Sequence, residues 1–401
     1  MFNIRYIEND IIRIGVSDRK LNIFEAVYPI ANGVAYNSYA IIDEKTAVID
    51  TVDAHCAKQF FENLNAALNN RNLDYLIVQH MEPDHAALIP DVINKYPEAQ
   101  IICSQKASDM IKQFFGNEHN YNVSVIKEND TLSLGKHQLH FVAAPLVHWP
   151  EVMLTYDSTS KTLFSADAFG SFGAVNGNIS DAEYDINEEY INEARRYYTN
   201  IVGKYGVQVQ NVLKKASALE IERICPLHGL ILEKNITKFI SLYDKWSKYE
   251  PEEKGVVIAY SSVYGGTENA ADILASKLAD KGIRNIKMYD TSMTHNSFIL
   301  SEMFKYSHIV LATTTYNNDV FVTMDNLIKS IVSHGLKNRK YAIIQNGSWS
   351  ITCGAVIKEA ISKLAGSEII SDMMSVKSAL QSNQISELDS LAEEIINSIN
   401  M

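Results

Sequence analysis

The stretch HMEPDH, residues 80–85, places four side chains that can bind a metal within six residues. It directly follows the apolar segment LDYLIVQ (73–79), whose pattern is typical of a buried strand. Side chains at the end of such a strand can fan outward from a loop. Imidazole and carboxylate ligands without thiolates suit iron, manganese or zinc. The sequence therefore predicts a metal site at this strand end.

Three more candidate ligands follow at similar strand ends: His148 in APLVHWP, Asp167 in FSADAFG and His228 in ICPLHG. Any of these histidines alone would more often be a surface or core residue. Together with the cluster at 80–85, which would be costly without a cation to neutralise it, they predict a dinuclear site. Metal ions in such sites lie ~3.5–4 Å apart, and a carboxylate such as Asp167 is the natural bridge. The histidines outside this pattern are expected to be ordinary residues: His55, His119, His137, His140, His295, His308 and His334.

The first part of the chain alternates strand-like and helical segments. YAIIDEKTAVIDTV (39–52) predicts two short strands around a polar turn, and 56–70 has a helical pattern. PDVINKYPEAQIICSQ (90–105) repeats the passage from helix to strand. Further strands are expected around 123–126, 139–144, 152–156 and 162–165. This order predicts sheets covered by helices.

The charged segment KYEPEEKG (248–255) lacks periodicity and is the best linker candidate, so we expect domains at 1–250 and 255–401. After it the pattern becomes regular. GVVIAYSS (255–262) is an apolar strand, a helix is expected from about Glu268 to Lys281, and HIVLATTTY (308–316) and KYAIIQNGSW (340–349) repeat strand and loop. These segments predict a doubly wound parallel sheet with functional loops after its strands.

Three of those loops favour a flavin. The first, SSVYGGTE (261–268), opens a helix with glycines and hydroxyl groups, which lets backbone N–H groups surround a phosphate. It resembles the flavodoxin phosphate loop, usually written T-G-N-T, with Gly266 in place of the asparagine. TTTYNN (313–318) and NGSWS (346–350) follow the next strands at the positions of the other flavodoxin loops, and Trp349 is placed to stack on a flavin ring.

FMN fits better than NAD, because GxGxxG and a following ribose-binding acid are absent. The predicted FMN-binding residues are Ser261, Ser262, Val263, Tyr264, Gly265, Gly266, Thr267, Thr314, Thr315, Tyr316, Asn317, Asn318, Asn346, Gly347, Ser348, Trp349 and Ser350.

The metal motif resembles that of the metallo-β-lactamase superfamily, whose hydrolases carry HxHxDH. Here Glu82 stands where those hydrolases have their second histidine, and HxExDH resembles the diiron signature of the flavodiiron proteins (A-type flavoproteins). The stretch FEAVYPIANGVAYNSYAIID (24–43) also resembles the first strands of that family. The resemblance implies an N-terminal αββα sandwich followed by a flavodoxin-like domain. It assigns the first iron to His80, Glu82 and His148, the second to Asp84, His85 and His228, and the bridge to Asp167.

The same resemblance implies an oxidoreductase. Its reactions would be four-electron reduction of O2 to water, or two-electron reduction of two NO molecules to N2O and water, and we lean toward O2. Electrons would reach the two irons through FMN from an external donor such as rubredoxin, although a reduced deazaflavin coenzyme serves some relatives. Members of the family form head-to-tail dimers that place one subunit's FMN beside the other's irons, so a homodimer or a dimer of dimers is expected.

The composition of the chain excludes several classes of partner. A net charge of −12 makes nucleic acid an unexpected partner, since phosphate binding needs clustered positive charge. No apolar run approaches the ~20 residues that span a bilayer, and the first residues do not resemble a signal peptide, so we expect a cytoplasmic protein with no membrane partner. The four cysteines form no CxxC pair, which argues against a built-in rubredoxin module.

Two other functions fit parts of the pattern. The first is a dizinc hydrolase of the lactamase fold with an accessory flavodoxin domain, and Glu82 argues against it. The second is an electron carrier whose metal domain has decayed into a scaffold, and the complete ligand set argues against that.

Overall fold

The computed structural model describes residues 1–116 and 121–401, and these form two compact units. The first unit comprises Met1–Tyr198 and Val207–Asp244, and the second comprises Thr199–Gly206 and Lys245–Met401. The domain limits 1–250 and 255–401 stay a prediction. Part of the expected linker is ordered as strand, because β17 begins at Glu253. His119 lies outside the described residues.

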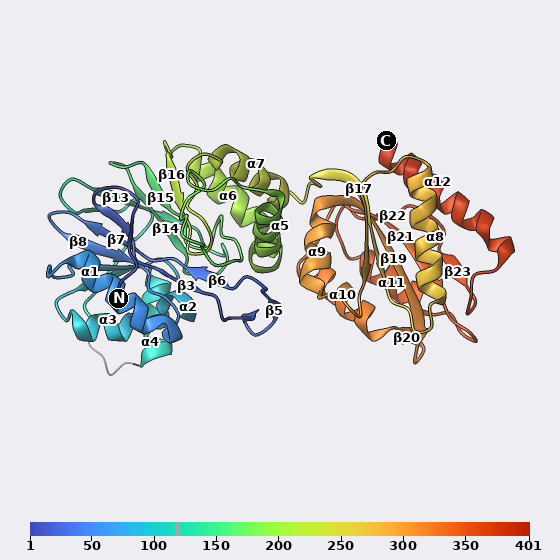
Figure 1. Cartoon of the computed structure of the whole chain (residues 1–401), viewed down its shortest axis with the longest axis horizontal. Helices are drawn as coiled ribbons and strands as arrows, with labels where there is room; N and C mark the ends of the chain where they lie inside the picture. Colours follow the sequence, from blue (N-terminus) through green and yellow to red (C-terminus); the bar gives the residue numbers. More distant parts are fainter. Residues whose placement is uncertain (117–120) are drawn as a thin grey trace. The chain divides into compact units, whose positions relative to one another are not determined.

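The first unit is built around two sheets (Figure 1). One has seven strands in the order β1-β2-β7-β8-β9-β10-β11, antiparallel up to β8 and parallel from β8 to β11. Their bounds are β1 Arg5–Tyr6, β2 Ile11–Arg13, β7 Tyr39–Ile42, β8 Thr46–Ile49, β9 Tyr75–Val78, β10 Gln100–Cys103 and β11 Val123–Val125. Two short pairs lie outside it: β3 (Val16–Asp18) with β6 (Val34–Tyr36), and β4 (Ile23–Phe24) with β5 (Tyr28–Pro29).

The second sheet has five strands, antiparallel except for the last pair. They are β12 Thr131–Ser133, β13 Gln138–Ala143, β14 Met153–Asp157, β15 Thr162–Phe164 and β16 Arg223–Cys225. The core lies between the two sheets, where residues such as Ile49 and Ile77 of the first meet Phe141 and Phe164 of the second. Burying these side chains is the main force that holds the sheets together.

Helices cover the outer faces of both sheets (Figure 1). Those beside the first sheet are α1 Ala57–Leu68, α3 Ile89–Lys95 and α4 Gln105–Phe115, and those beside the second are α5 Glu188–Tyr197, α6 Gly206–Ala216 and α7 Ile236–Ser247. The predicted αββα sandwich is confirmed.

The second unit is a parallel sheet with strand order β18-β17-β19-β21-β22, which is the flavodoxin order 2-1-3-4-5. The strands are β17 Glu253–Tyr260, β18 Ile286–Asp290, β19 Tyr306–Tyr316, β20 Asp319–Val320, β21 Lys340–Asn346, β22 Glu368–Ile369 and β23 Met374–Val376. Apolar residues of α8 (Gly266–Asp280) and α12 (Ile385–Asn400) form the core on one face. The opposite face is covered by α9 (Asn296–Lys305), α10 (Val322–Ser333) and α11 (Cys353–Ile361) (Figure 1). The predicted doubly wound sheet is confirmed.

No helix in the described part of the chain is both long enough and apolar enough to cross a bilayer.

The loop expected at 313–318 is mostly strand. β19 continues through Tyr316, because β20 folds back and pairs Thr315 with Val320 and Tyr316 with Asp319. Only Asn317 and Asn318 form the turn, and both have the positive φ that asparagine tolerates (52° and 60°). Thr314, Thr315 and Tyr316 are therefore strand residues with fixed directions.

His137, expected to be ordinary, forms a buried ion pair at the end of the second sheet. Its Nδ1 atom lies 2.6 Å from Asp157 Oδ2, its Nε2 atom lies 3.1 Å from Asp10 Oδ2, and the side chains of His137 and Asp157 are fully buried. Burial opposes the charge on the imidazole. The bonds to Asp157 and Asp10 outweigh that effect and raise the pKa of His137 to about 9.

This pair predicts a pH-dependent stability. Because the folded pKa lies above the ordinary value of ~6.5, the contribution of charged His137 is complete below pH ~6.5 and is lost as the pH rises to about 9. We expect His137→Gln to lower the free energy of unfolding by about 1–3 kcal/mol at pH 6 and by clearly less at pH 9.5. Urea unfolding of both proteins at the two pH values measures this difference, and an equal difference at both would contradict the assignment.

Candidate functional site

The stretch 80–85 leaves β9 and enters the single turn of α2 (Pro83–Ala86). Asp50 directs it there from a left-handed conformation (φ 53°), accepting hydrogen bonds from the backbone N–H of Gln79 at 2.8 Å and from its side-chain amide at 3.2 Å. Pro83 suits the first helical position, where a missing N–H has no consequence. Thr51 donates its hydroxyl to the carbonyl of His85 at 2.7 Å. The turn is thus held from neighbouring strand ends.

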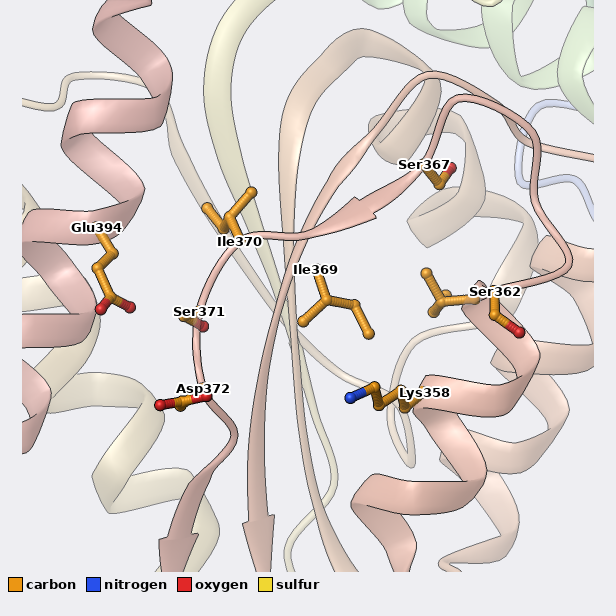
Figure 2. A pocket seen from close by; sticks show the side chains of 9 residues that line it. Lys358, Ser362, Ser367, Ile369, Ile370, Ser371, Asp372 and Glu394 are labelled. Carbon is orange, nitrogen blue, oxygen red and sulfur yellow. The ribbon is translucent and has the colours of Figure 1, made fainter.

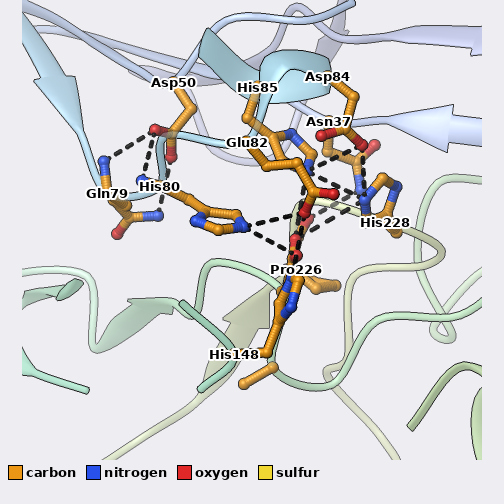
Figure 3. Close-up of polar contacts among 12 residues, drawn as sticks. Asn37, Asp50, Gln79, His80, Glu82, Asp84, His85, His148, Pro226 and His228 are labelled. Carbon is orange, nitrogen blue, oxygen red and sulfur yellow. Dashed lines mark hydrogen bonds and ion pairs between the residues drawn. The ribbon is translucent and has the colours of Figure 1, made fainter. Parts of the chain in front are cut away.

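His228 is positioned by the strand ends opposite. Asn37 donates to the carbonyls of Pro226 and Gly229 at 2.9 and 3.0 Å, which shapes the loop that carries His228. The imidazole Nδ1 of His228 lies 2.9 Å from the carbonyl of Ala35. That bond leaves the Nε2 atom directed into the site (Figure 3).

Asp167 lies between two pairs of histidines. Its Oδ2 atom is 2.9 Å from Nε2 of His148 and 3.4 Å from Nε2 of His80. Its Oδ1 atom is 3.2 Å from Nε2 of His85 and 3.7 Å from Nε2 of His228. One carboxylate therefore faces both halves of the cluster, the geometry that a bridging ligand needs.

Each half has a carboxylate of its own (Figure 3). Glu82 Oε2 lies 3.2 Å from Nε2 of His80 and 3.1 Å from Nε2 of His148. Asp84 Oδ2 lies 3.4 Å from Nε2 of His85 and 3.3 Å from Nε2 of His228. The structure thus brings together all seven residues predicted from the sequence, in two groups that share Asp167: His80, Glu82 and His148 form the first half, and Asp84, His85 and His228 the second.

The cluster is buried and strongly coupled. Burial opposes charge on His80, yet the charge of Asp167 and the hydrogen bonds from His80 to nearby carboxylates raise the pKa of His80 well above its usual value. In the same way Asp167 and Glu82 raise the pKa of His148 to about 9. The histidines in turn hold the pKa of Asp167 well below its usual range. The buried carboxylates are therefore stable as anions only if positive charge lies beside them, because little water reaches this space.

Several atoms indicate that metal ions fit this demand. Both carboxylate oxygens of Asp84 and the Oδ1 atom of Asp167 are buried without a hydrogen-bond partner among the described residues. The Nε2 atoms of His85 and His228 face each other at 3.0 Å, although only a proton or a cation between them makes that approach favourable. Nitrogen and oxygen donors without thiolates suit iron, manganese or zinc.

A third group, made of Asp18, His55 and Cys56, also has ligand atoms close together. Here the imidazole of His55 already contacts Asp18 on one side and Asp53 on the other. Burial, with the charges of Asp18 and Asp53, raises the pKa of the Cys56 thiol to about 12 and disfavours the thiolate that a metal needs. We assign no site to this group.

The predicted flavin loops meet at the carboxyl ends of β17, β19 and β21. Ser262 Oγ accepts a hydrogen bond from the N–H of Gly265 at 3.1 Å, and Gly265 adopts φ 85° just before α8. The hydroxyls of Ser261 and Thr313 lie 2.5 Å apart, and Asn346 donates to Thr267 Oγ1 at 3.2 Å. Each loop is therefore tied to its neighbour around a helix N-terminus, the arrangement that suits a phosphate group.

A fourth loop joins them that the sequence pattern did not indicate. Ser378, after β23, donates its N–H to Asn346 at 3.0 Å and its hydroxyl to Ser348 at 2.9 Å. Its carbonyl would lie 2.2 Å from a Cβ at position 266, so only glycine fits there. This contact explains Gly266 in place of the asparagine of the flavodoxin loop.

Two aromatic side chains of these loops are almost fully exposed, Tyr264 at 99% and Trp349 at 93%. Such exposure of large rings beside a phosphate-type loop is expected where a flat ligand or a partner surface covers them. Stacking of Trp349 on a flavin stays a prediction.

The second unit also contains a cavity of about 630 Å³ away from these loops (Figure 2). It is open and polar, and its lining includes Lys358 of α11, Ser362 just after that helix, Ile369, Asp372 and Glu394 of α12. None of the predicted residues lines it, and we assign it no function.

Three residues at the metal cluster were missed by the sequence pattern: Asp50, Glu151 and Tyr197. Glu151 lies 2.8 Å from Nδ1 of His80, and the ring of Tyr197 lies 5.4 Å from that of His228. Glu151 has one local signal, since it follows His148 closely in HWPE (148–151). Asp50 has the same kind of local signal as the ligands, since it directly follows the apolar strand β8, whereas Tyr197 at the end of α5 has none.

Comparison with known proteins matches both parts of the chain. Residues 34–229 match the ODP family beta lactamase model, and residues 258–388 match the flavodoxin model. An uncharacterised protein of Methanocaldococcus jannaschii is 30% identical over 79% of this chain and 78% of its own length. The anaerobic nitric oxide reductase flavorubredoxin of Escherichia coli is 29% identical over 86% of this chain and 72% of its own. The structure of rubredoxin oxygen:oxidoreductase from Desulfovibrio gigas matches with a TM-score of 0.93, 26% identity and 99% coverage of each chain.

The shared position of Asp167 predicts that both halves of the cluster depend on it. A divalent metal such as Zn²⁺ or Fe²⁺ should stabilise the protein by about 4 kcal/mol at a thousand times its dissociation constant, and Asp167→Ala should remove most of that gain. Thermal unfolding with and without metal measures it. Asp157→Asn, which removes another buried carboxylate beside a histidine, is the control and should keep the gain. Full metal stabilisation of Asp167→Ala would exclude a bridging role.

Proposed function

The chain belongs to the flavodiiron proteins, and on that basis we propose that it reduces O2, NO or both at a dinuclear iron site supplied with electrons through FMN. The observation that carries the proposal is Asp167, whose two oxygens face two complete sets of histidine and carboxylate ligands. The names of two relatives support the substrates, since one is called a nitric oxide reductase and another an oxygen:oxidoreductase.

In this proposal the first iron is held by His80, Glu82 and His148, and the second by Asp84, His85 and His228, with Asp167 shared. When bound, two ferrous irons supply electrons to a small diatomic molecule, and FMN passes on singly the electrons that it receives in pairs. Glu82 adds a negative charge where lactamase-type hydrolases have histidine, which favours the more highly charged oxidised state of iron.

Aromatic rings around His228 keep this region of the site dry. Phe24 lies edge-on at 5.4 Å between ring centroids, Tyr197 at 5.4 Å and Tyr36 at 5.9 Å. All three are buried. Water held away from the ligands strengthens the electrostatic hold of the carboxylates on a cation. The rings also leave an apolar wall suited to a small uncharged gas.

For the flavin, the N-terminus of α8 with Ser262 and Thr267 would hold the phosphate, and the strand ends at 314–318 and 346–350 would hold the ring. The external donor would be rubredoxin or a protein like it, which the name of the Desulfovibrio relative supports. A cytoplasmic location stays a prediction.

We further propose a head-to-tail homodimer, or a dimer of such dimers. The exposed rings of Tyr264 and Trp349 beside the flavin loops support a partner surface at this place. Closed symmetric assemblies are also the common case among soluble oligomers.

The first experiment is metal and flavin analysis of the purified protein, with consumption of O2 and of NO followed in parallel under a reduced-rubredoxin donor. We expect two irons and one FMN per chain and rapid loss of at least one gas, because the seven proposed metal ligands lie together and the proposed flavin loops meet at one edge of the sheet. The ratio of the two rates identifies the substrate. Two zinc ions with no gas consumption would reject the proposal and favour a hydrolase.

Mixing two inactive variants tests the dimer. Asp167→Ala should lack the metal pair, and Ser262→Ala combined with Thr267→Ala should lack FMN. If electrons pass between subunits, refolding an equal mixture should restore about a quarter of the wild-type rate, since half of the dimers would then hold one working pair of sites. Each variant refolded alone is the control. No recovery in a mixture shown to contain mixed dimers would place electron transfer within one chain.

A further inference from the structure

Glu151 stands directly behind one of the proposed metal ligands. Its Oε1 atom lies 2.8 Å from Nδ1 of His80 and accepts the backbone N–H of Met81 at 2.8 Å. The side chains of Glu151 and His80 are both fully buried. The other oxygen, Oε2, has no hydrogen-bond partner among the described residues. The Oε1 atom of Glu151 therefore bonds both the side chain of His80 and the backbone of Met81.

The backbone around Glu151 keeps the carboxylate in place. Ser104, the N-cap of α4, donates its hydroxyl to the carbonyl of Glu151 at 3.0 Å. The ring of Trp149 lies edge-on to the ring of His80 at 5.3 Å between centroids. His80 thus has its ring fixed on one side by an aromatic residue and on the other by an anion.

None of the other three histidines has a carboxylate hydrogen-bonded to its second ring nitrogen among the described residues, although the buried carboxylate of Asp50 interacts with His85 electrostatically. His228 directs its Nδ1 atom to the neutral carbonyl of Ala35. Within residues 1–116 and 121–401, the Nδ1 atom of His85 is buried without a partner, and the contacts of His148 run through Nε2. The two halves, otherwise matched with two histidines, one carboxylate and a share of Asp167, differ in this respect.

A carboxylate that accepts the second N–H of a metal-bound imidazole fixes its tautomer and makes the opposite nitrogen a stronger donor. A backbone carbonyl fixes the tautomer without adding charge. We propose that Glu151 is a positioning residue for His80 and makes the position formed by His80, Glu82 and His148 the tighter of the two metal positions. This inference rests on the proposed dinuclear site.

The test is calorimetric titration of Co²⁺ into the metal-free full-length protein, which reads metal affinity without any enzyme assay. We expect two binding steps in the wild type. Glu151→Gln keeps the size of the side chain but removes its charge, and it should weaken the tighter step by about 10–100-fold while changing the weaker step by less than about twofold. If Glu151→Gln does not fold, Glu151→Asp keeps the charge but withdraws it from His80 by one methylene group, and it should weaken the same tighter step by a smaller factor while leaving the other step unchanged.

Two controls separate this role from general damage. Asp157→Asn removes a buried carboxylate from another buried histidine, His137, and should leave both steps unchanged. In a His80→Asn background, Glu151→Gln should have no further effect on the remaining step, whereas in a His228→Asn background it should still weaken binding.

The outcomes are distinct. Equal weakening of both steps by Glu151→Gln, or no weakening, would overturn the inference and leave the dinuclear site intact. A wild-type protein that binds no pair of ions would overturn both the inference and the proposed function.

Discussion

Glu82, Asp84 and Asp167 face four imidazoles in a region that is almost closed to water, and the chain around them is arranged to hold these groups where they are. Burying that much negative charge is costly unless cations neutralise it. The ligands come from four separate stretches between residues 80 and 228, so the two sheets must meet in one register for the cluster to exist. Asp50 accepts a backbone N–H, and Thr51 and Asn37 donate to backbone carbonyls; these bonds hold the ligand loops at the strand ends. The two packed sheets form a rigid frame, and the loops at their strand ends carry the side chains that can bind metal.

The second unit also holds its proposed binding loops on a rigid sheet, here for a flavin instead of metal ions. A flavin phosphate needs backbone N–H groups, and a parallel sheet gathers its loops at one edge. Here the loops are tied to one another through Ser261 and Thr313, through Thr267 and Asn346, and through Ser378. These bonds leave the rings of Tyr264 and Trp349 in solvent. A stiff frame with exposed rings suits an electron carrier that must meet a partner surface without rearranging.

The cluster is nearly symmetric in its ligands but not in what lies behind them. Asp167 divides its oxygens between the halves, and each half has a carboxylate and two histidines. Behind the histidines the environments differ: a carboxylate contacts His80, a neutral carbonyl contacts His228, and Nδ1 of His85 has no hydrogen-bond partner among the described residues. Two ions bound in the two halves would therefore experience different fields. Such a difference would allow the affinity of each metal position to be set separately.

The sequence alone determined the ligand types, their order and the two kinds of domain. HMEPDH and the three later ligands are recognisable because each follows a strand, and strand ends are a local property of hydrophobic pattern. The glycine-rich turn before α8 is local in the same sense. Tertiary structure decided the rest. Glu151 reaches His80 across 71 residues, and Ser378 reaches Asn346 across 32, so no local pattern contains either contact. The extension of β19 through Tyr316 likewise depends on pairing with β20. The sequence gives the type of each side chain directly. Which residue that side chain contacts depends on how distant segments pack together in the folded protein.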